Sequence, residues 1–147
     1  MLWLAWMTLA AGQDWTPSED ATRVHRALSL RHDALSCEEV EALSSTPVET
    51  LREMVQHVRA PAWVPMRAAT CLATRHGLET LPDLKVWVSD EATLGLGMHL
   101  LNHLDDMEEP VALVVAEHAL QHGPESLDAA SRVSGSARPK VQALVKP

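Results

Sequence analysis

Apolar residues recur at intervals of three and four along much of this chain, which is the spacing of one face of an α-helix. In the segment 91–104, for example, Leu94, Met98 and Leu101 share one face. Strand-forming residues are few and never alternate with polar residues over a useful length. The pattern therefore predicts an all-α protein.

Helix starts are marked by capping sequences. TPSE (16–19), SCEE (36–39) and TPVE (46–49) each place a hydroxyl residue three positions before a Glu, as in a capping box. Gly77 is expected to end a helix in the left-handed conformation that glycine tolerates. The connections are short, so neighbouring helices should pack antiparallel. The expected helices cover 17–31, 37–44, 47–58, 64–76, 80–88, 91–104, 110–122, 124–133 and 138–145.

Two stretches of the chain resemble each other. CLATRHGLETLP (71–82) and EHALQHGPESLD (117–128) both contain a helix end, then His-Gly, then a new helix. The longer stretch WVPMRAATCLATRHGLETLPDLKVWVSDEA (63–92) places Arg67 ahead of an Ala-rich helix, then a glycine, a leucine-bearing helix and Ser-Asp. Over 63–105 this order resembles a HEAT-type repeat of the bacterial kind, with V-P-M-R where that family has V-R.

The resemblance implies a short right-handed α–α superhelix of HEAT-like helical hairpins, forming a single domain over 16–147. Small residues at Ala68, Ala69 and Ala73 would let such helices approach closely. An irregular or bundled all-α domain is the alternative. HEAT-type folds generally act as scaffolds, so the resemblance also implies a role in binding another protein.

The first twelve residues are predicted to be a signal peptide. Residues 2–11 form an apolar run too short to span a bilayer comfortably, and Ala10, Ala11 and Gly12 supply small residues for cleavage. No Lys or Arg precedes the run, which departs from the usual pattern. The alternatives are a buried N-terminal helix or a short apolar tail. We expect export to the periplasm or the cell exterior and no membrane span in the mature chain.

Cys37 and Cys71 are the two cysteines of the chain. In an exported protein they could pair, closing a loop of about 34 residues and stabilising the fold by roughly 3–4 kcal/mol. They could equally be two small buried apolar side chains. The sequence leaves both interpretations open.

The composition limits the classes of partner. Apolar residues make up 46% of the chain and charged residues 22%, as in a globular protein. The net charge of −8 argues against binding nucleic acid or an anionic membrane surface, because both require a basic face. The expected partner is another protein.

The histidine pairs His99/His103 and His118/His122 have the spacing of a helical metal chelate. Angular positions at 100° per residue place both pairs away from the packing faces, so we expect solvated histidines and no metal site. Motifs for zinc proteases, serine hydrolases, CxxC redox centres and phosphate-binding loops are absent. No catalytic residue or cofactor is expected.

Two features are candidates for contact with a partner protein. Trp63 lies between prolines and is either an exposed aromatic anchor or a core residue at a helix corner. The acidic turn contains Asp105, Asp106, Glu108 and Glu109. It is a solvated loop, a docking patch for a basic partner or a weak calcium contact, although its spacing is not that of an EF-hand loop. The expected function is thus a non-catalytic interaction module. The alternatives are an enzyme resembling HEAT-like bilin lyases and a histidine-based metal-binding protein.

Overall fold

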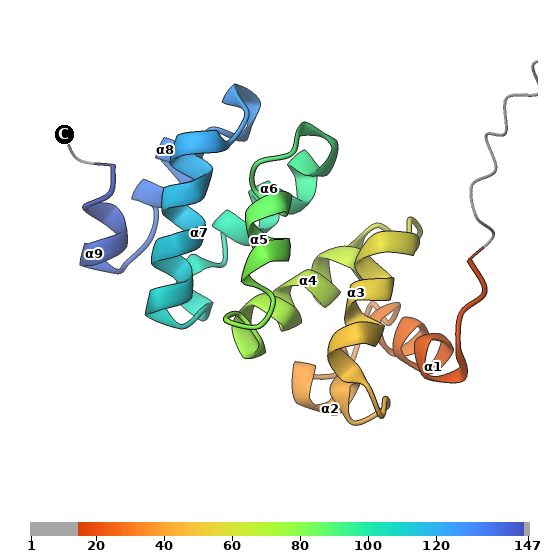
Figure 1. Ribbon diagram of the computed structural model, residues 1–147. Coiled ribbons are helices and arrows are strands. Elements are labelled where there is room, and N and C mark those ends of the chain that lie inside the picture. The colour runs from red at the N-terminus through yellow and green to blue at the C-terminus, as the bar shows by residue number, and fades with distance from the viewer. Residues whose placement is uncertain (1–14, 146–147) are drawn as a thin grey trace, which may run out of the picture.

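The computed structural model describes residues 15–145 of the chain, and within them every regular element is a helix (Figure 1). The all-α prediction is confirmed. The expected signal peptide, residues 1–12, lies outside the described residues. No helix within 15–145 is long and apolar enough to cross a membrane. The helices are α1 (Glu19–Leu28), α2 (Cys37–Glu41), α3 (Pro47–His57), α4 (Trp63–Arg75), α5 (Leu81–Trp87), α6 (Leu94–Leu101), α7 (Glu109–His122), α8 (Ala129–Ser134) and α9 (Pro139–Gln142), with 3₁₀ helices at Glu91–Thr93, Leu104–Asp106 and Glu125–Leu127.

Of the three expected capping boxes, one is formed completely. At Ser36 the capping box is complete, because its hydroxyl accepts from the N–H of Glu39 while the Glu39 carboxylate accepts from the N–H of Ser36. The box expected at Thr16 is wrong: α1 begins two residues later, where Ser18 Oγ accepts from the N–H of Ala21. Thr46 does precede α3, but its side chain accepts no capping hydrogen bond.

Two long helices expected from the pattern are interrupted. The segment 91–104 consists of a 3₁₀ turn followed by α6, because the Asp90 side chain accepts from the N–H of Ala92 and shapes a tight entry turn. The segment 124–133 is divided at Asp128, whose φ of 51° lies in the left-handed region. A left-handed residue cannot continue a right-handed helix, so α8 starts only after it.

Gly77 is needed for space rather than for its backbone angle. The expected left-handed conformation is wrong, since no glycine within 15–145 has a positive φ. A Cβ at Gly77 would lie 2.7 Å from the Ala73 carbonyl oxygen and 2.8 Å from Val111 Cγ1. The glycine therefore lets the end of α4 approach α7.

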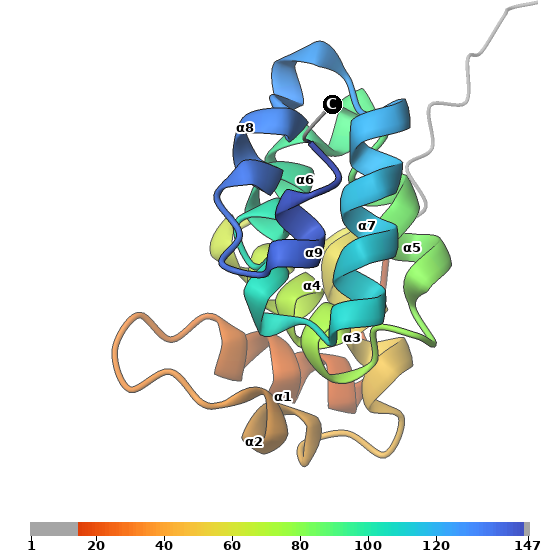
Figure 2. The same ribbon diagram turned by 90° about the vertical axis from the view of Figure 1, so that its left-hand side faces the viewer.

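The helices form two layers. Helix α5 packs against α7, while α4 packs against α6 and α6 against α8. Figure 2 shows α5 and α7 on one side of the molecule and α6 and α8 on the other. At the N-terminal end α1 contacts both α3 and α4. Several helices thus contact the next helix but one along the chain.

Small residues lie where the helices are closest. Ala68, Ala69 and Ala73 on α4 have no exposed surface, and α4 makes its most extensive contact with α3. The larger core residues around them are mainly aliphatic, in keeping with a chain that has no Phe or Tyr. As the sequence predicted, these three alanines lie where α4 packs closely in the core.

Asp20 fastens α1 to the turn before α3. Its carboxylate accepts from the backbone N–H of Ser45 at 2.9 Å and from the Ser45 hydroxyl at 3.0 Å, and it also accepts from Ser44. These bonds, with Arg23 nearby, lower the pKa of Asp20. The stability they contribute is present above the pKa of the unfolded-state carboxyl and is lost as the pH falls through the lower folded-state pKa.

Candidate functional site

The two cysteines are paired. Their Sγ atoms lie 2.11 Å apart, at disulfide-bonding distance, and join the first residue of α2 to the middle of α4. Cys71 is buried and Cys37 is half-buried. Of the two interpretations that the sequence left open, the structure favours the pair.

Trp63 is the first residue of α4 and is half-buried against the core. The Arg31 guanidinium lies 5.1 Å from its ring centroid and that of Arg67 lies 6.0 Å away, so two cations flank the indole. Its Nε1 is buried without a hydrogen-bond partner among the described residues. This packing is closer to a core residue at a helix corner than to an open aromatic anchor, and partner contact by Trp63 remains a prediction.

The acidic turn is divided among intramolecular contacts. Asp105 accepts from the Ser136 hydroxyl and from the N–H of Ala137, and these bonds lower its pKa. Asp106 lies 3.0 Å from Nδ1 of His103, and Glu109 lies 3.4 Å from the Lys140 ammonium. Among the described residues only Glu108 of the four has no ion pair or side-chain hydrogen bond. The turn therefore offers a basic partner less free charge than its sequence implies.

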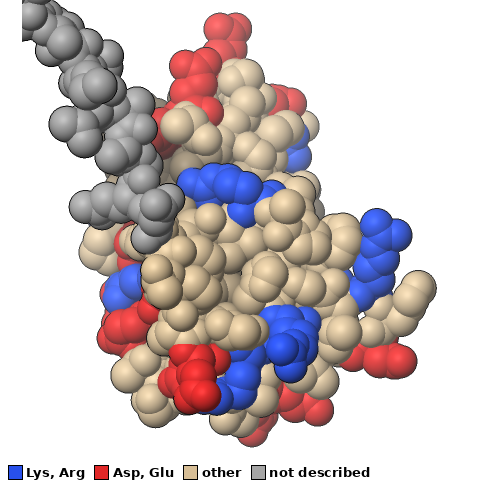
Figure 3. Space-filling model, turned by 90° about the vertical axis from the view of Figure 1, so that its right-hand side faces the viewer, with Lys and Arg blue, Asp and Glu red and all other residues tan. Residues whose placement is uncertain are grey.

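Charge is also mixed at the other end of the molecule. Figure 3 shows the α1–α3 end, where basic and acidic residues surround a broad uncharged centre. The net charge of −8 is thus not gathered into one acidic patch on this face.

The histidine pairs differ from each other in their surroundings. The expectation that both project into solvent is wrong for His99, His103 and His118, which are half-buried. His99 also has Nε2 2.8 Å from Thr70 Oγ1 on α4. The angular argument gave α6 a single packing face, whereas α6 packs against both α4 and α8. Burial and then the neighbouring His103 lower the pKa of His99. His122 is exposed on α7, as expected.

A cavity of about 230 Å³ lies beside the cysteine pair, and we call it the disulfide pocket. It has an apolar wall from the end of α1 and the following loop, and a polar wall from α4 and α6. No group of three or more His, Cys, Asp or Glu side chains in residues 15–145 is arranged to hold a metal ion. The pocket is lined by Leu28, Ala34, Leu35, Cys37, Arg67, Thr70, Cys71, His99 and His103.

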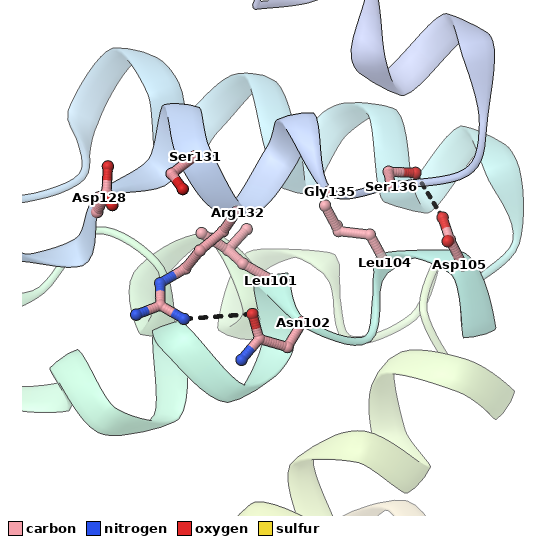
Figure 4. A pocket seen from close by; sticks show the side chains of 9 residues that line it. All are labelled: Leu101, Asn102, Leu104, Asp105, Asp128, Ser131, Arg132, Gly135 and Ser136. Carbon is pink, nitrogen blue, oxygen red and sulfur yellow. Dashed lines mark hydrogen bonds between the residues drawn. The ribbon is translucent and has the colours of Figure 1, made fainter.

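A second cavity, the polar groove, has a volume of about 360 Å³ and runs between α8 and the end of α6 (Figure 4). Much of its polar lining is already bonded internally. Arg132 donates through Nε to the Leu127 carbonyl at 2.8 Å and through Nη1 to Asn102 Oδ1 at 3.2 Å. At the other end Ser136 donates to Asp105, as the dashed line in Figure 4 shows. The Arg132–Asn102 bond joins α8 to the end of α6, and the Ser136–Asp105 bond joins the residues that follow the two helices, so the groove is part of their packing.

A third cavity, the apolar groove, has a volume of about 400 Å³ and lies where the α3–α4 corner faces the α5–α6 corner. Arg59 is its one charged residue, and its guanidinium donates to the carbonyls of Val55, Val58 and Gln56 at the end of α3. The groove is therefore mainly apolar. It lies between the end of α3, the start of α4, the end of α5 and the start of α6. It is lined by Val55, Gln56, Val58, Arg59, Ala62, Pro65, Met66, Trp87, Ala92, Thr93, Gly95 and Leu96.

Comparison of the chain with protein-family models, with curated proteins and with solved structures found no match. The HEAT-type resemblance therefore remains a prediction.

Proposed function

We propose that this protein is an exported, non-catalytic interaction module whose helices form a short HEAT-like stack and whose apolar groove binds a short apolar segment of a partner protein. The observation that carries the proposal is the groove itself. It draws apolar side chains from the α3–α4 corner and the α5–α6 corner, including Val58, Met66 and Leu96. Grooves between helices commonly receive apolar peptide segments in this way.

The chemistry of the groove supports an apolar ligand. Arg59 donates to the last carbonyls of α3, so fewer of its N–H groups are free to bind a partner. Trp87, only 8% exposed, supplies a broad apolar wall behind the opening. A partner side chain placed there would lose its contact with water, which is the main source of binding free energy at such sites.

Gly95 provides a way to close the groove without disturbing the fold. It is exposed on α6, and a Cβ at this position would meet only Met66 Cε, at 3.8 Å. Gly95→Trp should therefore fill the groove and weaken partner binding at least tenfold. The measurement is capture of partners by the two variants Gly95→Trp and Gly95→Ala, followed by affinity determination for any protein that they capture differently.

Gly95→Ala is the matched control. It adds a single methyl group in ordinary contact distance and should bind the partner as the unmodified chain does. A partner held equally by both variants would place its binding surface elsewhere, and the proposed role of the groove would be abandoned.

Export is the second element of the proposal. The cysteine pair at disulfide-bonding distance supports it, because disulfides persist mainly in oxidising compartments. The apolar run at the N-terminus supports it independently. We expect the protein recovered from outside the cytoplasm to begin near Gln13, as determined by intact-mass and N-terminal peptide analysis. Protein that keeps residues 1–12 and stays in the cytoplasm would contradict export.

A further inference from the structure

His99 and His103 have a hydrogen-bonding arrangement that leaves one ring nitrogen of each free. Thr70 Oγ1 donates its single hydrogen to the Met66 carbonyl at 2.9 Å. It can therefore only accept at its 2.8 Å contact with His99, so Nε2 of His99 carries the proton. In the neutral ring Nδ1 of His99 is then a bare nitrogen with a lone pair.

His103 is oriented in the same manner by a carboxylate. Its Nδ1 lies 3.0 Å from Asp106 Oδ2, which can only accept, so Nδ1 carries the proton and Nε2 is bare. Metal-binding histidines typically donate their other N–H to a carboxylate or another oxygen, which fixes the tautomer and makes the free nitrogen a better ligand. Thr70 and Asp106 supply those two acceptors.

The two rings also lie together. Their centroids are 4.5 Å apart with the planes tilted by 47°, and both rings line the disulfide pocket. Bonds of about 2.0–2.1 Å join imidazole nitrogen to a divalent metal, so rings this close can share one ion. Arg67 also lines the pocket, but its Nη1 donates to the carbonyls of Leu28 and Leu30 at the end of α1.

We propose that His99 and His103 form a two-imidazole site for a divalent cation of the Cu²⁺ class, with water in the remaining coordination positions. Imidazole suits copper, nickel and zinc, and Cu²⁺ binds nitrogen ligands most strongly of the three. Cys37 and Cys71 face the same pocket but are joined to each other, so they supply no thiolate. This site is separate from the apolar groove and does not depend on the proposed partner.

The second histidine pair serves as a comparison within the same chain. His118 and His122 have ring centroids 4.7 Å apart, nearly the same separation. Within the described residues, neither ring has the hydrogen bond to an oxygen atom that His99 and His103 have. This pair lacks the acceptors that orient His99 and His103, so its affinity for a cation should be lower.

The test uses the full chain with its cysteines paired, in the background His118→Gln/His122→Gln, titrated with Cu²⁺ against a competing chelator. One equivalent should bind, with electron paramagnetic resonance showing two nitrogen ligands. His103→Gln should weaken binding at least tenfold and leave one nitrogen in the spectrum. Asp106→Ala, which removes an exposed acceptor and leaves both rings in place, should weaken it about tenfold.

His32→Gln is the control, because His32 is exposed in the loop between α1 and α2 and should not alter Cu²⁺ binding. Thermal unfolding of each variant without metal verifies that the fold is retained. Affinity unchanged by His103→Gln, or Cu²⁺ binding that is lost in the His118→Gln/His122→Gln background, would overturn the proposal.

Discussion

Reduction of the Cys37–Cys71 pair is expected to lower the free energy of unfolding by about 3–4 kcal/mol. The two cysteines are 34 positions apart in the sequence, so the intact bond closes a long loop and lowers the conformational entropy of the unfolded chain. For a domain of this size the loss corresponds to a fall in melting temperature of about 10–15 °C.

The position of the bond adds a structural reason. Helix α2 contains only five residues, too few to be stable by itself, and Val40 is its one buried side chain. The bond at Cys37 is what holds the start of α2 on α4. Hydrogen exchange in the reduced protein should therefore increase first in residues 29–45.

The measurement compares oxidised and reduced protein by thermal and urea unfolding. The variant Cys37→Ala/Cys71→Ala, treated with the same reductant, controls for effects of the reagent and should show no further change. Melting temperatures that agree within about 2 °C before and after reduction would mean that the pair does not constrain the chain.

Gly97→Ala is expected to destabilise the protein by about 1–3 kcal/mol, although helix propensity alone predicts a gain. Gly97 is buried in the middle of α6. A Cβ at this position would lie 2.7 Å from the Trp87 carbonyl oxygen and 3.3 Å from Val88 Cα, both backbone atoms at the end of α5. Backbone cannot yield as a flexible side chain can, so α5 and α6 would have to separate.

Gly95→Ala is the control two residues earlier on the same helix. Its Cβ would meet only Met66 Cε at an ordinary contact distance of 3.8 Å, so this substitution should stabilise the protein by about 0.5–1 kcal/mol. The difference between the two variants in the free energy of unfolding, measured with urea, gives the energetic effect of the close contact between α5 and α6. A gain of stability in both would show that the two helices are not in contact at Gly97.

The sequence predicted the all-α content correctly because helix signals are local. Helix starts are marked by residues only a few positions apart. Examples are the complete capping box at Ser36 and the prolines at the starts of α3, α5 and α7. The starts that were wrong depended on competition between neighbours. Thr16 and Ser18 both have cap chemistry, and only the folded backbone shows that Ser18 accepts the bond.

The candidate sites were harder to predict because they depend on contacts between distant segments. His99 was assigned to solvent from its angle on one helix, and the α4 residue that holds it lies 29 positions away in the chain. Asp105 was taken as free charge, yet Ser136, 31 positions later, bonds to it. The apolar groove is formed by two separate segments, 55–66 and 87–96. The hydrophobic pattern around exposed Gly95 did not indicate that these segments lie together.

The most direct test of the proposed function is the affinity of a captured partner for the chain with Gly95→Ala and with Gly95→Trp, measured together with amide hydrogen exchange in the complex. If the apolar groove is the binding site, Gly95→Trp weakens binding at least tenfold while Gly95→Ala does not. Protection then appears over residues 55–66 and 87–96, which line the groove. Equal affinities for the two variants, with protection elsewhere, would contradict the assignment of this groove as a protein-binding site.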